Sequence, residues 1–413
     1  MYTLFRNILL FASTLATAAP SGQRYRATGR AIYFLTNDAN NAVVSIPIAA
    51  DGTLSEGTVT VTGGAGSNAI NGANNMPAAP DALVAQSSLT IAGNNLFAVN
   101  AGSNTLSMFS ISPSDPTKLT PVGRPASVPG DFPNTVAASP KHNLVCVGTT
   151  GARAGITCTT FSPTTGLIIG LGDDGGPHMD ALRPFDLGQS TPPVGPTNTV
   201  SQVFFSDDES KLFTTVKGNP ASNKTGFFSV FPIEQNLAGS RLAMHDTRSS
   251  PPGTAVLFGS AVVPGNSRVF VTDPSFGAAV LDVDEASGVA TLGARGAIAG
   301  QKATCWATIS EATRSAFVAD AGMNRLVEMS LEDASVISMV DLSSAEDRDP
   351  GLTDLKAAGN FVYALSPGNG TTAAAVTVLD VSGGKGAGPR MVQHFELTGL
   401  GVGKNAQGMA VLV

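Results

Sequence analysis

The feature that most constrains this chain is a repeated strand–turn–strand unit. In each copy, a strand rich in β-branched or aromatic residues leads into a polar turn and then a second alternating strand. Clear examples are "AIYFLTNDANNAVVSIPI" and "NLFAVNAGSNTLSMFSI". The pattern occurs seven times, at spacings of 45 to 67 residues, with copies that begin at Ala31, Asn95, Leu144, Lys211, Arg268, Ser315 and Asn360.

Further short strands flank most copies. "TVAASPKHN" from Thr135 precedes the third copy, and "KLTPVG" from Lys118 follows the second. Each unit therefore predicts a four-stranded antiparallel meander. A single such sheet cannot bury both of its faces, whereas radial stacking buries them between neighbours. We predict an all-β, seven-bladed β-propeller; a pair of β-sandwiches is the alternative.

The two ends of the repeat region complement each other. The copy at Ala31 has no preceding inner strand, while "NAQGMAVLV" from Asn405 predicts an inner strand with no outer strands after it. The C-terminal strand is therefore expected to complete the first blade, because an unpaired inner edge would otherwise stay open. We expect one propeller domain over residues 19–413.

The N-terminal residues have the pattern of an export signal. Arg6 precedes an apolar run from Ile8 to Ala16, and Ala16-Thr17-Ala18 is a small-residue cleavage site. We predict a signal peptide at residues 1–18 and a protein secreted to the extracellular space or cell wall. A buried N-terminal strand or helix is the alternative. No later run reaches the roughly 18 apolar residues of a membrane span.

The content of charged residues limits the binding partners that this chain can have. Charged residues make up 13% of the chain and the net charge is −7, which argues against nucleic acid because phosphate binding needs clustered Lys and Arg. No basic amphipathic stretch indicates membrane docking. We expect a monomer without cofactor or metal, since Asp173-Asp174 lacks further oxygen ligands. Two sequons predict glycosylation at Asn223 and Asn369.

The three cysteines divide into a pair and a single residue. Cys146 and Cys158 are equidistant from residue 152 in a predicted turn, so adjacent antiparallel strands place them opposite each other, within disulfide range. Export supplies an oxidising compartment; two reduced buried cysteines are the alternative. Cys305 lies beside Trp306, and we interpret it as a packing residue because no activating base is evident.

Two segments carry a family resemblance: "FFSDDESKLFTTVKG" from Phe204, and "GQSTPPVGPTNTVSQ" at Gly188–Gln202. With seven units, the chain resembles the lactonase-type propellers, which include 6-phosphogluconolactonase and the fungal 3-carboxymuconate cyclase. The resemblance implies a lactonase or lactonizing isomerase acting on a small carboxylic acid or its lactone. It also implies a catalytic histidine, with arginine and glutamate partners, at the channel mouth. Asn134 stands where that histidine is expected.

Catalytic candidates come from a long loop between blades. His178, Asp180 and Arg183 are close in sequence and are expected to form a catalytic or carboxylate-binding cluster at the channel mouth. The alternative is ordinary solvated loop polarity.

A second set of candidates lies where inner strands begin around the axis. Polar side chains at these positions converge on one cavity, which suits a small polar or carboxylate ligand; a water-filled channel is the alternative. A non-catalytic glycoprotein that binds cell wall or matrix is a further functional hypothesis. The channel candidates are Asp81, Asn134, Thr199, Ser201, Gln202, Lys302, Trp306, Asp354 and Gln407.

Overall fold

The computed structural model of the protein describes residues 29–171, 177–236, 239–343 and 349–413. Strands dominate these residues, and the one helix among them is a 3₁₀ turn at Pro220–Ser222. The all-β class is therefore confirmed. No helix within the described ranges is long and apolar enough to cross a bilayer. The predicted signal peptide at 1–18 and the pair Asp173-Asp174 lie outside the described residues.

Every hairpin predicted from the repeat is present as two paired antiparallel strands. Each hairpin belongs to a run of four antiparallel strands. Along the first half of the chain, the runs are β36 (Gln407–Leu412), β1 (Ala31–Leu35), β2 (Ala42–Pro47) and β3 (Thr58–Val61); β6 (Leu89–Ala92), β7 (Asn95–Asn100), β8 (Thr105–Ile111) and β9 (Leu119–Pro121); and β11 (Pro133–Ser139), β12 (Leu144–Thr149), β13 (Gly155–Ser162) and β14 (Gly166–Ile168).

The second half continues the same pattern. Its runs are β19 (Val200–Phe205), β20 (Lys211–Val216), β21 (Phe227–Asn236) and β22 (Gly239–Leu242); β24 (Ser260–Val262), β25 (Arg268–Asp273), β26 (Gly277–Val283) and β27 (Ala290–Ala297); β28 (Thr304–Ser310), β29 (Ser315–Asp320), β30 (Arg325–Met329) and β31 (Val336–Asp341); and β32 (Leu355–Ala358), β33 (Phe361–Ser366), β34 (Ala375–Asp380) and β35 (Arg390–Glu396).

Short strands extend or cover these sheets. A small separate sheet pairs the hairpin β4–β5 with β18 in parallel. The remaining strands lie at the edges of the larger sheets. The bounds are β4 (Ile70–Asn71), β5 (Met76–Pro77), β18 (Val194–Gly195), β10 (Ala126–Ser127), β15 (Gly170–Leu171), β16 (Pro177–His178), β17 (Arg183–Pro184) and β23 (Thr247–Ser249).

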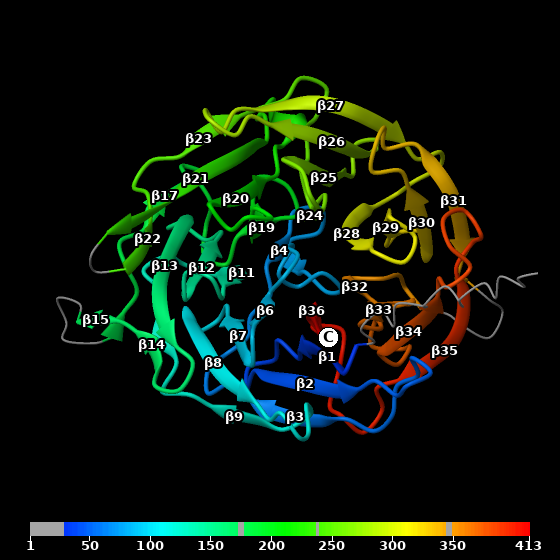
Figure 1. Ribbon diagram of the computed structural model, residues 1–413, viewed down its shortest axis with the longest axis horizontal. Coiled ribbons are helices and arrows are strands. Elements are labelled where there is room, and N and C mark those ends of the chain that lie inside the picture. Colours follow the sequence, from blue (N-terminus) through cyan, green and yellow to red (C-terminus); the bar gives the residue numbers. More distant parts are fainter. Residues whose placement is uncertain (1–28, 172–176, 237–238, 344–348) are drawn as a thin grey trace, which may run out of the picture.

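The sheets are arranged around one common centre, with β6, β11, β19, β24, β28, β32 and β36 nearest to it (Figure 1). The arrangement differs from the stacked sheets of the β-sandwich alternative. The strands next to the inner ones are buried along their whole length in β7, β12 and β29, whereas the outer strand β3 is largely exposed. Apolar side chains of neighbouring sheets pack together, as Ile32 does in one cluster with Tyr363. The core therefore lies between the sheets, as radial stacking requires.

The first and last strands pair. β1 and β36 are antiparallel neighbours, with Ile32 opposite Val411 and Tyr33 opposite Ala410. β36 is also packed close to β6 and β32. The C-terminal strand therefore lies beside β1, where an inner strand is expected before Ala31.

Candidate functional site

The centre of the ring is occupied by the chain itself. Residues Asp81–Ser88, which we call the axial segment, leave the hairpin β4–β5 and run between the inner strands before β6 begins. The backbone N–H of Gln86 donates to the Ser201 carbonyl at 2.9 Å, and that of Val136 donates to the Ser87 carbonyl at 2.8 Å. Several of the channel positions predicted from the sequence therefore converge, but on a segment of the same chain.

Side chains from four different sheets hold the carbonyls of the axial segment. Asn134 Nδ2 donates to Leu83 at 3.3 Å. Lys217 Nζ donates to Val84 at 2.5 Å. The Ala85 carbonyl accepts from Trp306 Nε1 and Gln407 Nε2, both at 3.1 Å. Because the side chains of Ala82–Ala85 are apolar and buried, the backbone polar groups of these residues need such partners.

The backbone of the axial segment is strained. Three of its non-glycine residues have positive φ: Asp81 at 68°, Val84 at 49° and Ser87 at 63°. A positive φ is a genuine outlier for a β-branched residue such as Val84. The axial segment is also packed closely against β36, since a Cβ added at Gly408 would lie 2.1 Å from Ser88 Oγ. Strain of this kind persists only where the surroundings over-determine the conformation.

The hairpin β4–β5 covers the start of the axial segment. Asn68 Nδ2 donates to the Ala78 carbonyl at 2.7 Å and to Asn405 Oδ1 at 2.8 Å. Asn405 Nδ2 in turn donates to Asp38 at 2.8 Å. These amides tie the hairpin to the residues just before β36. Beneath this cover, Asp81 and Ser87 keep partial exposure.

Four ionisable groups meet around the axial segment. Together with Gln407, we call Asp81, Lys217, Cys305 and Asp354 the axial cluster. Burial raises the pKa of Asp81 and lowers that of Lys217, and the attraction between the two charges opposes both shifts. Burial also raises the pKa of Asp354 to about 6 and raises the pKa of the Cys305 thiol. Perturbed groups gathered at one place mark a candidate functional site.

Two acceptor atoms at this site have no hydrogen-bond partner within the described part of the chain. They are Asn134 Oδ1 and Gln407 Oε1, and both side chains are fully buried. Their amide nitrogens are already used, Asn134 Nδ2 on Leu83 and Val200, and Gln407 Nε2 on Ala85 and Asp81. Exchanging oxygen and nitrogen would therefore break existing bonds. A buried acceptor without a donor costs stability, so a donor is expected at each atom.

Among solved structures, the periplasmic gluconolactonase PpgL of Pseudomonas aeruginosa is 14% identical, with a TM-score of 0.61; the match covers 92% of this chain and 99% of that one. A Bacteroides uniformis protein, provisionally assigned as a 6-phosphogluconolactonase, is 15% identical with a TM-score of 0.53 and coverages of 72% and 80%. The chain has the lactonase-type β-propeller fold. At such identities the likeness shows the fold alone. No model of a known family matches the sequence, and no curated protein does so either.

In this lactonase-type propeller, several predicted channel residues join neighbouring strands. Thr199 Oγ1 donates to Pro196, and Ser201 Oγ donates to Leu257, both at 2.8 Å. Gln202 brackets the backbone of Ser260, donating to its carbonyl at 3.1 Å and accepting from its N–H at 2.6 Å. All three side chains are buried. Ser201 and Gln202 hold β19 to the residues around the start of β24, and Gln202 Nε2 also lies 3.5 Å from Ser87 Oγ of the axial segment. The bond of Thr199 stays within its own turn.

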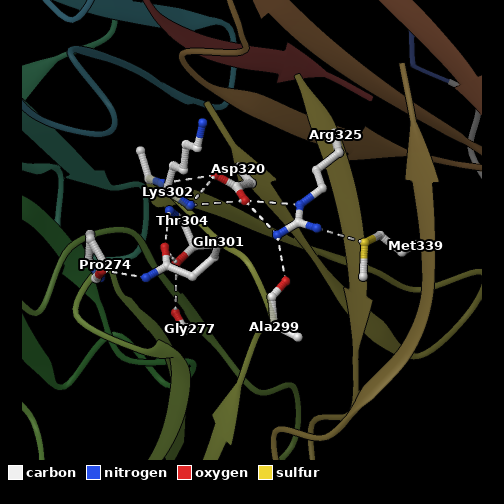
Figure 2. Close-up of polar contacts among 10 residues, drawn as sticks. Pro274, Gly277, Ala299, Gln301, Lys302, Thr304, Asp320, Arg325 and Met339 are labelled. Carbon is white, nitrogen blue, oxygen red and sulfur yellow. Dashed lines mark hydrogen bonds and ion pairs between the residues drawn. The ribbon is translucent and has the colours of Figure 1, made fainter. Parts of the chain in front are cut away.

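Lys302 belongs to a polar network at the start of β28 (Figure 2). Its backbone N–H donates to Asp320 Oδ1 at 3.2 Å, and Asp320 also forms an ion pair with Arg325 at 2.9 Å. Gln301 joins the same network by accepting from Thr304. Lys302 itself is exposed. The network fixes the strand that carries Cys305 and Trp306.

The predicted catalytic loop residues lie away from the axis. Asp180 and Arg183 do come together, at 2.9 Å, but Arg183 is 4% exposed and its guanidinium donates to the carbonyls of Ala243 and Leu242, both at 2.6 Å. β17, which carries Arg183, lies toward the outside of the ring (Figure 1). His178 is placed only as part of β16, and nothing is described of its side chain. The expected position at the channel mouth is wrong for Asp180 and Arg183, because Arg183 joins neighbouring blades.

The predicted cysteine pair is confirmed. Cys146 and Cys158 are directly opposite in the register of β12 and β13 and form a disulfide, with Cα atoms 4.0 Å apart. Cys305 is the free cysteine. The sequon residues Asn223 and Asn369 are both exposed. Their glycosylation stays a prediction.

Sequence reasoning missed Lys217 and most of the axial segment. Lys217 follows a buried strand, and only its position at a strand end within an apolar context distinguishes it from a solvated lysine. The segment "ALVAQSS" matches no strand of the repeat, and this mismatch was the available signal. Asp81 belongs to the axial segment, and Asn134, Trp306, Asp354 and Gln407 form hydrogen bonds with it. Their role as ligand-binding channel residues stays a prediction.

Proposed function

We propose that this lactonase-type propeller binds a small polar ligand at the axial cluster. The observation that carries the proposal is the pair of buried acceptors without donors, Asn134 Oδ1 and Gln407 Oε1. The Asp81 carboxylate lies next to Gln407, since Gln407 Nε2 approaches Asp81 Oδ1 at 3.4 Å. Few convergent polar groups in an apolar, largely preformed site are typical of small-molecule binding.

The two buried acceptors and the Asp81 carboxylate favour a neutral ligand that carries hydroxyl groups. Amide oxygens and carboxylates accept hydrogen bonds, and a hydroxyl supplies the matching donor. The cation of the cluster, Lys217, already donates to Val84 and lies 4.2 Å from the Phe258 ring centroid. A carboxylate ligand would therefore meet Asp81 and Asp354 without a free cation. Hydroxylated lactones fit this pattern better than the tricarboxylate that the resemblance to fungal 3-carboxymuconate cyclase implies.

Lactone hydrolysis is the second candidate function. The observation that favours it is Asp81, which is partly exposed and whose pKa burial raises. As general base, its carboxylate would take a proton from water while the water oxygen attacks the lactone carbonyl. The ring C–O bond then breaks, and the departing alkoxide takes the proton that Asp81 accepted from water, which gives the hydroxy acid and restores the Asp81 carboxylate. The described histidines lie elsewhere: His142 beside Ser240, and His245 and His394 on outer segments.

A titration separates these candidates. D-galactono-1,4-lactone and galactonate are titrated calorimetrically into the wild-type protein, into Gln407→Ala and into Gln235→Ala, whose glutamine is exposed on the outer part of β21. We expect saturable lactone binding that weakens at least tenfold in Gln407→Ala only. Acid release in a pH-stat that is lost in Asp81→Asn would establish hydrolysis. The absence of saturable binding to the wild type would overturn the proposal.

We also propose that seven blades form the ring and that β36 closes it. The pairing of β1 with β36 supports closure. Deleting Gly408–Val413 would expose the edge of β1 and remove buried side chains such as Met409. We expect the truncated protein to unfold well below the temperature of the full chain. An unchanged thermal midpoint would contradict closure.

Secretion, glycosylation at Asn223 and Asn369, and a monomeric state belong to the same proposal. The Cys146–Cys158 disulfide supports an oxidising compartment, and the exposure of both asparagines supports modification. Binding to cell wall or matrix, and lactonizing isomerase activity, stay alternatives. Intact mass of the protein purified from culture medium, before and after deglycosylation, tests secretion, processing at residues 18–19 and both sequons together.

A further inference from the structure

Within the described ranges, Lys217 is the charged side chain that holds the axial segment by direct contact with a carbonyl. Its side chain is 2% exposed, and Nζ donates to the Val84 carbonyl at 2.5 Å. The ammonium also lies 4.2 Å from the centroid of the Phe258 ring. Hydrogen bonds from charged donors are roughly twice as strong as neutral ones. This bond is therefore worth more than the neutral bonds that Asn134, Trp306 and Gln407 make to the same segment.

The contact is made at the strained residue. Val84 has a φ of 49°, which a β-branched side chain rarely adopts. Without an external constraint, the segment would relax to negative φ and move the Val84 carbonyl. Lys217 depends on the contact in return, because a buried ammonium needs acceptors around it. The lysine and the strained segment thus stabilise each other.

We infer that Lys217 locks the axial segment inside the channel, and that loss of its hydrogen bond to Val84 lets the segment leave the axis as a unit while the sheets stay folded. The segment is attached on one side to the hairpin β4–β5, whose Gly72–Pro77 residues are exposed. The other side continues into β6. Release would break the backbone hydrogen bonds that the segment makes to Ser201, Val136 and Val99, but none of the pairings between the four strands of each run. It would turn a closed centre into an open channel. The inference concerns the closure of the channel and does not depend on which ligand binds.

Cys305 provides an internal probe. It is the free thiol of the protein, is partly exposed, and is close enough to Asp81 and Lys217 for both charges to act on its pKa. Removing the Lys217 cation would by itself raise the thiol pKa and slow its reaction. Faster labelling in a Lys217 variant would therefore report greater access, because the electrostatic effect has the opposite sign.

The experiment compares thiol labelling and hydrogen exchange in wild type, Lys217→Met and Lys118→Met. Lys118 is the matched control, since its side chain is 75% exposed and forms a surface ion pair with Asp115. We expect at least tenfold faster maleimide labelling of Cys305 in Lys217→Met, with faster exchange at Gln86 and Ser87. Exchange in β12 should stay unchanged, as should all rates in Lys118→Met.

Two results would overturn the inference. One is a Lys217→Met protein that labels no faster than wild type. The other is labelling that rises only together with exchange in β12, because that reports global unfolding rather than local release. Should Lys217→Met fail to fold, Lys217→Gln keeps a neutral donor and is expected to give an intermediate labelling rate; a wild-type rate in that variant would equally contradict the lock.

Discussion

Two fully buried aspartates, Asp320 at the end of β29 and Asp354 beside the axial segment, have very different surroundings. Asp320 ends β29, pairs with Arg325 at 2.9 Å and accepts from the N–H groups of Lys302 and Ala303 (Figure 2). Asp354 has no ion pair within 4.0 Å among the described residues and accepts from backbone N–H groups, including that of Leu355 at 2.8 Å.

The two sites differ in what their aspartates do: Asp320 has a structural role, whereas Asp354 belongs to the candidate functional site. At Asp320 a cation compensates the buried charge, and the network holds a strand in place. At Asp354 burial outweighs the hydrogen bonds and raises the pKa to about 6. Ionisable groups whose pKa values are shifted by burial gather where the axial segment passes. We take this as the reason to place the candidate function at the axis rather than between blades.

Breaking the compensated site should have the largest effect. Asp320→Ala leaves Arg325, whose side chain is 11% exposed, without its partner and frees two backbone donors. We expect a loss of about 3–5 kcal/mol in the free energy of unfolding, measured by denaturant titration. Asp282→Ala is the control, because Asp282 is 52% exposed in its pair with Arg268 and should cost less than about 1 kcal/mol. Equal losses of stability in Asp320→Ala and Asp282→Ala would contradict a special structural role for Asp320.

At Asp354, the absence of an ion pair within the described part of the chain should make the free energy of unfolding depend on pH. A carboxyl whose pKa is higher in the folded state contributes stability below its unfolded pKa, and that contribution is lost as pH rises through the folded pKa. For Asp354 the window runs from the ordinary pKa of 3.8 to about 6, which corresponds to a loss on the order of 3 kcal/mol. Asp354→Asn cannot ionise, so its stability should fall less between pH 4 and pH 7. Parallel curves for variant and wild type would contradict the shift.

The smallest expected effect concerns backbone strain in the axial segment. Glycine adopts positive φ without strain, whereas alanine does not, so Val84→Gly should be more stable than Val84→Ala by about 1 kcal/mol. The order should reverse at Val147, a buried residue of β12, where glycine is entropically less favourable. Thermal midpoints of the four variants decide the point. Alanine above glycine at both positions would show that Val84 is unstrained.

The sequence predicts what is local and repeated. The hairpins follow from alternation and turn residues, and the Cys146–Cys158 bridge follows from a symmetric spacing about one turn. Positions that face the axis, such as Trp306 and Gln407, follow from their place at the start of inner strands.

Contacts between distant residues could not be predicted in this way. The hydrogen bond from Lys217 to Val84 spans 133 positions, and that from Trp306 to Ala85 spans 221. Arg183 was misplaced for the same reason, because its partners Leu242 and Ala243 are 59 and 60 positions away. No local period in the chain specifies such pairs.

The most direct test of this account is hydrogen–deuterium exchange of the wild-type protein over the axial segment, compared with β12 and with the exposed turn of the hairpin β4–β5. If the chain fills its own channel, the amides of Gln86 and Ser87, which donate to Ser201 and Asp354, should be protected far beyond those of the hairpin turn. Exchange at Gln86 and Ser87 as fast as in the hairpin turn would contradict the account.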